Sequence, residues 1–173
     1  RALESLGYSS HPKVPSLISS ALNSGETLWI SAALAAISHS ADETWEPQVL
    51  ANLQSTEHEV LFEAVRAAGE LELTSSLESL AAILENEDTD PEIRMAAIWS
   101  LSQIGGDFAR ETLQTLLESS EDEDEIELLE SAMDNLNSGL ESPSYKLLDF
   151  DPDNDEEEDD LYYEEDDELE DFD

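Results

Sequence analysis

The chain has no cysteine and very little positive charge, and each shortage excludes a class of function. Without a thiol there is no disulfide, no thiolate nucleophile and no cysteine-bound zinc or iron–sulfur centre. Only 6 Lys and Arg residues stand against 45 Asp and Glu residues, which gives a net charge of −39. Because contact with a phosphate backbone depends on Lys and Arg, we expect the chain to bind neither nucleic acid nor an anionic membrane surface.

Long apolar runs are also missing. No run approaches the roughly 20 apolar residues that a membrane-spanning helix needs, and the N-terminus carries no signal-peptide pattern. The lack of cysteine fits a reducing compartment, so we expect a cytoplasmic protein. The chain begins at Arg1 rather than Met, and RALESLGYSS has the pattern of the end of a helix, so we expect a piece of a longer protein.

A block of about 33 residues recurs along the chain. Its equivalent inward positions fall at spacings of 33, 32, 33 and 35 residues: Leu3, Ala36, Ala68, Leu101 and Leu136. A second apolar series lies half a block away: Ile18/Leu22, Val49/Leu53, Leu80/Leu84 and Leu113/Leu117. Two apolar helices per block are typical of an α-solenoid, because one pair cannot bury its apolar face alone and stacks on its neighbours. We therefore predict an all-α fold with about four helical pairs in residues 1–140.

The acidic residues divide the chain into two parts. Residues 1–140 hold 27 acidic and 5 basic residues, a net −22, whereas residues 141–173 hold 18 and 1, a net −17. Only the second part combines dense charge with few apolar residues. Burial of so few apolar side chains cannot offset the conformational entropy that is lost on folding. We predict a disordered acidic C-terminal tail over residues 141–173, with its densest acid from residue 149 onward.

One helix carries a recognisable motif. In IRMAAIWSLSQIGG, residues 93–106, an apolar residue is followed by Arg-x-Ala-Ala-x-x-x-Leu-x-x-Ile-Gly. This pattern resembles the HEAT repeat, and more narrowly the short bacterial form shared with phycobiliprotein lyases. The resemblance covers roughly residues 1–140 and is strongest around Arg94, Leu101 and Gly105, while Trp29 and Leu61 take the place of Arg94 in earlier blocks. It implies a right-handed α-solenoid used mostly as a scaffold for protein partners, with a phycobiliprotein-lyase-like or chromophore-handling subunit as the alternative.

A candidate partner-binding stripe follows from placing the inner helices at 100° per residue. The positions opposite the core face are Ile30, Leu34, Phe62, Arg66, Met95 and Trp99. If these helices line a concave wall, the six side chains form an apolar groove for a partner segment. The alternative is that neighbouring inner helices bury them. Glu130 and Asp134 hold the equivalent positions in the last block, so an apolar partner stretch followed by basic residues would suit the groove.

Among the acidic residues of the tail stand several apolar residues that could dock on a basic protein: Leu161, Tyr162, Tyr163, Leu169 and Phe172. The alternative is that the tail only confers solubility. Its alternating Asp residues from Asp149 superficially resemble a calcium loop. An EF-hand would require Gly and Glu where Asn154 and Asp160 stand, so we expect no specific calcium site.

Catalysis has little support in the sequence. The three histidines, His11, His39 and His58, are dispersed, and none belongs to a recognisable nucleophile pattern. We therefore expect a non-enzymatic protein without cofactor, metal or catalytic residues, which acts as a scaffold for a basic protein partner. The pattern leaves the oligomeric state open.

Overall fold

The computed structural model describes residues 3–141, and within that range the chain is helical throughout, without strands. Short connections join its eight α-helices; two of these connections contain a 3-10 helix, and a third 3-10 helix precedes α1. The elements in chain order are η1 (Glu4–Tyr8), α1 (Val14–Leu22), α2 (Thr27–Ser38), η2 (Glu43–Trp45), α3 (Glu46–Asn52), α4 (His58–Glu70), η3 (Thr74–Ser76), α5 (Leu77–Glu85), α6 (Pro91–Ile104), α7 (Gly106–Ser119) and α8 (Glu123–Glu141).

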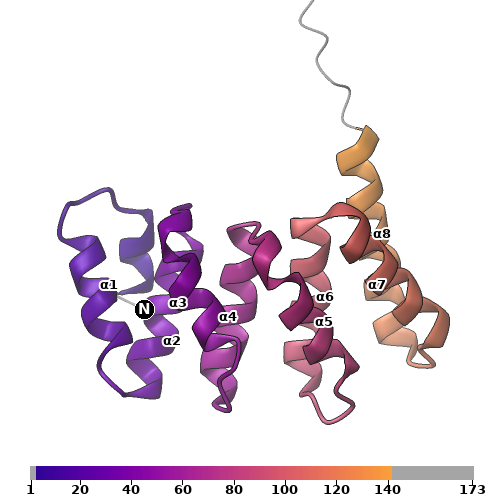
Figure 1. The fold of residues 1–173 in the computed structure, drawn as a ribbon, viewed down its shortest axis with the longest axis horizontal. Helices are drawn as coiled ribbons and strands as arrows, with labels where there is room; N and C mark the ends of the chain where they lie inside the picture. Colours follow the sequence, from indigo (N-terminus) through magenta and orange to yellow (C-terminus); the bar gives the residue numbers. More distant parts are fainter. Residues whose placement is uncertain (1–2, 142–173) are drawn as a thin grey trace, which may run out of the picture. The chain divides into compact units, whose positions relative to one another are not determined.

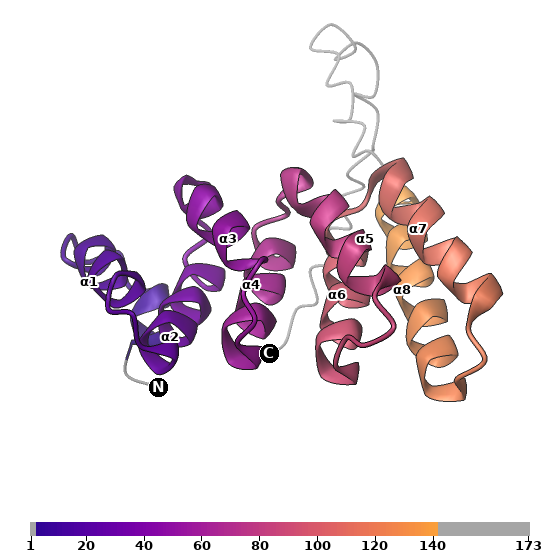
Figure 2. The ribbon, with the colours of Figure 1, turned by 60° about the horizontal axis from the view of Figure 1, so that its bottom comes forward.

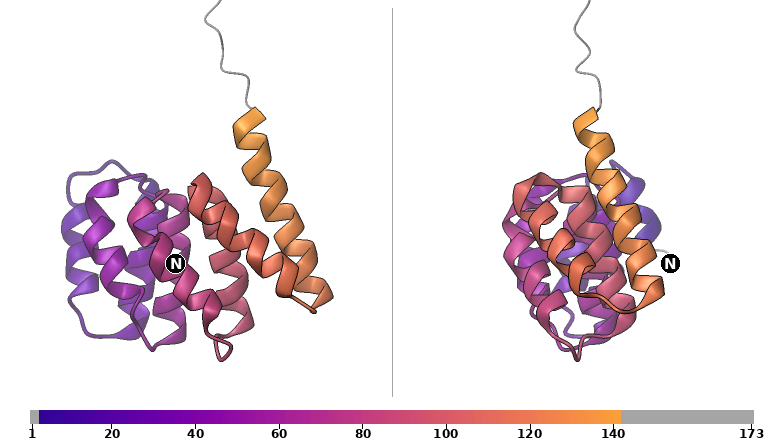
Figure 3. Two further views of the ribbon diagram at one scale, coloured as in Figure 1. Left: turned by 45° about the vertical axis from the view of Figure 1, so that its right-hand side comes forward. Right: turned by 90° about the vertical axis from the view of Figure 1, so that its right-hand side faces the viewer.

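The helices form two layers of a solenoid (Figure 1). The inner layer contains α2, α4, α6 and α8, each packed on the next, and the outer layer contains α1, α3, α5 and α7 (Figure 2). Each outer helix also packs on its inner partner. Helix α8 extends beyond the ends of α6 and α7 (Figure 3). The predicted all-α solenoid of helical pairs is confirmed; the predicted acidic tail lies outside the described residues.

Helix α6 begins and ends where the sequence predicts. The Asp90 carboxylate caps its start by accepting a hydrogen bond of 2.9 Å from the backbone N–H of Glu92, and Pro91 is the first helical residue. Gly105 follows the last residue with φ of 71°, a backbone conformation that glycine adopts at the least cost. Among the described helices, none is both long and apolar enough to cross a membrane.

The core shows that one predicted alignment is wrong by one residue. Placing Trp29 and Leu61 at the position of Arg94 also aligns Leu28 with Val60 and Ile93, yet Leu28 is 76% exposed whereas the other two are 3% and 4% exposed. The buried residues instead align as Ala33, Ala64 and Ala97, and as Leu34, Val65 and Ile98, all fully buried. The repeat from α2 to α4 is therefore 31 residues, the spacing between their first residues, Thr27 and His58. Because α2 is apolar at most positions, its sequence does not specify which face turns inward.

Helices α4 and α6 approach each other closely at Gly69, which has no side chain. A Cβ atom added to Gly69 of α4 would lie 2.7–2.8 Å from atoms of Ser100 on α6. The Ser100 hydroxyl donates a hydrogen bond of 2.9 Å to the carbonyl oxygen of Val65, so the same contact also satisfies a buried polar group. This close packing fixes the spacing of α4 and α6, two of the three helices that carry the predicted stripe.

Candidate functional site

The inner face of the solenoid carries a groove between α4 and α6. Its volume is about 320 Å³, and every lining residue comes from these two helices. Phe62 and Arg66 line one wall, and Met95 and Trp99 line the other. Met95 is 50% exposed and Trp99 is 45% exposed, although both are large apolar side chains. We call this feature the inner groove; it brings together four of the six residues of the predicted stripe.

The other two predicted residues do not reach the inner groove. Leu34 is fully buried in the core, and Ile30 is half-buried and packs against the core. For these two residues the alternative holds, because the one-residue shift in α2 turns them inward. In the corrected alignment, Ser31 and Ala35 take the positions of Phe62 and Arg66. The groove therefore spans two repeats instead of three.

The positive charge of Arg66 in the inner groove is balanced by nearby carboxylates. Its Nη1 atom donates to the Glu63 carboxylate at 3.0 and 3.3 Å, and its guanidinium lies 5.8 Å from the centre of the Phe62 ring. Burial raises the pKa of the Glu63 carboxyl, and the positive charge of Arg66 opposes that rise. Glu70 and Glu92 add two carboxylates to the lining. The groove thus combines apolar walls with a surplus of acid.

Three polar side chains meet where α4 and α6 begin. Nε2 of His58 lies 3.3 Å from a carboxylate oxygen of Asp90 and 3.5 Å from one of Glu92. The backbone N–H of Glu92 holds the pKa of the Asp90 carboxyl below its usual range, and His58 adds to that effect. These side chains are exposed and their ligand atoms lie within 4.8 Å of one another, a spacing that a divalent cation would accept. In this structure the contacts link neighbouring repeats.

The described histidines all have local partners. The His39 ring stacks on Tyr8 with centroids 4.5 Å apart, and the two side chains also share a hydrogen bond of 3.1 Å. Nδ1 of His11 accepts a hydrogen bond from the backbone N–H of Lys13. His58 pairs with the two carboxylates described above. Each histidine thus lies near the end of a helix and contacts neighbouring side chains or backbone there.

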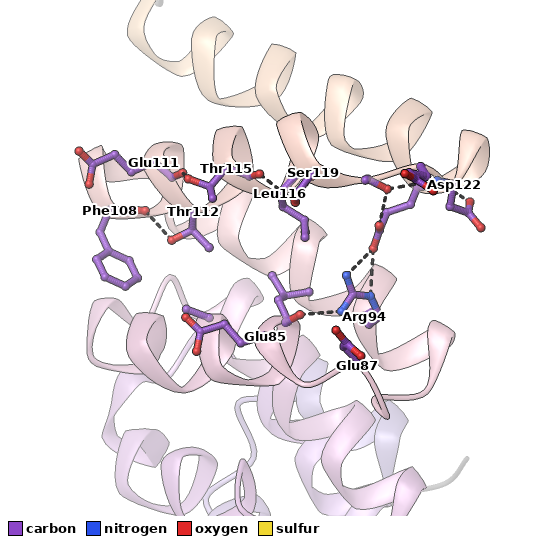
Figure 4. A pocket seen from close by; sticks show the side chains of 15 residues that line it. Glu85, Glu87, Arg94, Phe108, Glu111, Thr112, Thr115, Leu116, Ser119 and Asp122 are labelled. Carbon is purple, nitrogen blue, oxygen red and sulfur yellow. Dashed lines mark hydrogen bonds and ion pairs between the residues drawn. The ribbon is translucent and has the colours of Figure 1, made fainter.

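A second and larger pocket lies between the outer helices α5 and α7, and the sequence did not predict it. Its volume is about 860 Å³. Apolar side chains line its floor: Ala81, Leu84, Phe108 and Leu116. Acidic side chains also line it: Glu85, Glu87, Glu111, Glu121, Asp122 and Glu125. We call it the outer pocket (Figure 4).

Two structural features produce the outer pocket. Helix α7 packs mainly on α8 and α6 and touches α5 only sparsely, so a gap remains between the outer helices. Arg94 then closes one end of the gap, because it binds Glu125 and the carbonyl oxygen of Leu84 (Figure 4). Phe108 lies at the other end and points into the gap. The sequence signal was the spacing of Phe108, Thr112, Thr115 and Leu116, which share one face of a helix.

The described residues thus form an α-solenoid that carries the inner groove on its inner layer and the outer pocket on its outer layer. The sequence model of the HEAT repeat family matches residues 46–137, which include α3 to α7, most of α8, and both features. The match covers more than half of the chain, so the chain belongs to the HEAT repeat family. The comparison with curated proteins gives no match. The predicted tail-docking residues lie outside the described part of the chain.

Proposed function

We propose that this chain is a non-enzymatic scaffold that binds a basic protein partner in the inner groove. The observation that carries the proposal is the exposure of Met95 and Trp99 beside Phe62. Large apolar side chains clustered in a groove are typical of protein contacts, and Trp is enriched among residues that dominate binding energy. An extended peptide or a partner helix would bury these side chains.

Charge indicates the nature of the partner. Residues 1–140 carry a net −22, and two of their five basic residues, Arg66 and Arg94, are paired with Glu63 and Glu125. An acidic field of this strength steers a basic protein toward the surface and repels an acidic one. The partner segment that fits therefore places an apolar side chain between Phe62 and Trp99 and has Lys or Arg on either side.

Family membership supports a scaffold more than an enzyme. Helical repeat proteins present extended surfaces to other proteins, and their stability comes from stacking of neighbouring repeats. Among the described residues, the histidines have the local partners expected of structural side chains. A fold does not define one function, so the groove has to be tested directly.

The test compares two tryptophans of nearly equal exposure. Trp99 lines the inner groove and is 45% exposed, whereas Trp29 on α2 is 49% exposed and lies outside it. Affinity capture from a lysate would use the wild-type chain, Trp99→Ala and Trp29→Ala at moderate salt. A discrete basic partner that is retained by Trp29→Ala and lost by Trp99→Ala supports the proposal. Equal capture by both variants contradicts it, because the groove then contributes nothing to recognition.

A further inference from the structure

We propose that the outer pocket is a second docking site, which takes a Lys- and Arg-rich amphipathic helix of a partner protein. The pocket belongs to α5, α7 and the residues around Arg94, whereas the inner groove belongs to α4 and α6. The two features share no lining residue. This inference therefore goes beyond the proposed function, and it does not depend on it.

The floor of the pocket fits the apolar face of a helix. Leu84 of α5 lines the pocket together with Leu116 and Phe108 of α7, and Figure 4 shows the two α7 side chains on the side of the helix that borders the gap. Phe108 is 43% exposed, so an apolar side chain docked in the pocket would remove a large part of its ring from water. Helix α7 has 14 residues, or about 21 Å at the rise of an α-helix. A docked helix lying along the whole of α7 would extend over about four turns, in the manner of a helix in a groove.

The rim of the pocket supplies negative charge without internal partners. Among the described residues, no hydrogen bond or ion pair engages the carboxylates of Glu85, Glu87, Glu111 or Glu121. The one basic side chain in the lining, Arg94, is already committed to Glu125 and to the carbonyl oxygen of Leu84. Positive charge at the rim therefore has to come from the occupant.

Charge also decides which occupant fits. The chain's own residues 141–173 carry 18 acidic residues and 1 basic residue, so they would meet repulsion at this rim. A second copy of the chain, with a net charge of −39, would meet the same repulsion. A basic helix with one apolar face satisfies both floor and rim, because its Leu-type residues would cover Phe108 while its Lys or Arg residues reach the carboxylates.

The experiment uses the full chain and synthetic peptides. The probe is an amphipathic helix of about 18 residues with Leu along one face and Lys elsewhere, a length that exceeds α7. A second peptide has every Leu replaced by Ser, so that it keeps the charge without the apolar face. Fluorescence anisotropy measures the Kd of each peptide, and backbone NMR shifts locate the bound residues. We expect the Leu peptide to bind and to shift residues of α5 and α7.

Matched variants separate the outer pocket from general attraction. Phe108→Ala should weaken the Leu peptide by about tenfold or more, whereas Leu17→Ala, at 47% exposure on α1, should not change its Kd. Replacing Glu85, Glu87 and Glu111 with Gln should weaken binding more than replacing an equal number of acids outside the pocket, namely Glu26, Glu59 and Glu78. Thermal unfolding of each variant confirms that the fold is retained.

Several results would overturn the inference. They are equal affinity for the Leu and Ser peptides, no binding at low salt, unchanged Kd on Phe108→Ala, or shifts confined to α4 and α6. Trp99→Ala tests the inner groove separately, and it should not change the Kd of the Leu peptide for the outer pocket. Loss of binding on Trp99→Ala with none on Phe108→Ala would place the peptide in the inner groove and remove the second site.

Discussion

Arg94 on α6 and Glu125 on α8 form the ion pair that joins the last two repeats. Nε and Nη2 of Arg94 donate to the same Glu125 oxygen at 2.9 and 2.7 Å, and both side chains are about four-fifths buried. Nη1 of Arg94 donates to the carbonyl oxygen of Leu84 at 2.6 Å, and the Ser120 hydroxyl donates to the other Glu125 oxygen, also at 2.6 Å. One guanidinium thus connects α5, α6 and α8 and closes the outer pocket.

Removing Arg94 should therefore destabilise the solenoid. We expect Arg94→Ala to lower the free energy of unfolding by about 2–3 kcal/mol, because Glu125 and the end of α5 lose their partner in a largely buried place. Arg94→Lys should recover only part of the loss, since an ammonium cannot reach Glu125 and Leu84 with a planar fork. Urea unfolding monitored by circular dichroism measures both. The control is Arg110→Ala, which removes an exposed hydrogen bond to Asn137; an equal loss there would contradict the assignment.

Gly69 offers a test in which two effects have opposite signs. An alanine in a helix interior is usually more stable than a glycine by roughly 0.5–1 kcal/mol, and Gly69, the penultimate residue of α4, would gain at most this much. At Gly69 the added Cβ would lie 2.8 Å from the Cα atom of Ser100, so packing should outweigh propensity. We expect Gly69→Ala to lower the unfolding free energy by about 1–3 kcal/mol. Since the clash involves backbone, Ser100→Ala should not rescue it. A stabilised Gly69→Ala would show that α4 and α6 can separate at little cost.

The sequence predicts the fold because its signals agree at several levels. The Asp90 cap, Pro91 and Gly105 mark the ends of α6, and the recurring apolar positions indicate stacked pairs. The rotation of α2 could not be obtained in this way. Its apolar residues occupy most positions, so only packing against α4 decides that Leu34 turns inward. The one-residue error in the alignment of α2 therefore placed Ile30 and Leu34 in the predicted stripe, whereas the structure turns them toward the core.

The two candidate sites differ in how much the sequence could reveal. The inner groove depends on spacing within α4 and α6, which a helical projection captures, and Phe62 and Trp99 were found in this way. The outer pocket depends on a gap between α5 and α7, which is a matter of tertiary packing. The partner of Arg94 was equally hidden, because Glu125 stands in a run of acids with no local mark to distinguish it.

The raised pKa of Glu63 predicts a pH dependence with a definite sign. Burial favours the protonated carboxyl in the folded state, so the contribution of Glu63 to stability is fully present below the unfolded pKa. It is lost as the pH rises through the folded pKa. The stability of the wild type relative to Glu63→Gln should therefore fall as the pH rises from below about 4.3 toward neutrality. Urea unfolding across this range measures the difference, and a rising difference would contradict the cause assigned here.

Asp90 should show the opposite slope, because its pKa is lowered in the folded state. The backbone N–H of Glu92, with His58 beside it, favours the charged carboxylate. The contribution of this group is present above the unfolded pKa and is lost as the pH falls through the folded pKa. The stability of the wild type relative to Asp90→Asn should thus rise with pH over the acidic range. The same unfolding series measures it, and a difference that falls as the pH rises would contradict the cause assigned to Asp90.

Residues 149–173 should influence the rate of partner binding more than its final strength. They add dense negative charge, which attracts a basic partner over the Debye length of about 10 Å at 0.1 M salt. Deleting them should slow association at low salt, whereas Trp99→Ala should speed dissociation at every salt concentration, because it removes short-range apolar contact. Stopped-flow or biosensor kinetics with the captured partner separate the two rates. If the deletion raises the dissociation rate at moderate salt, the tail makes direct contact, and its apolar residues from Leu161 to Phe172 become the next positions to replace.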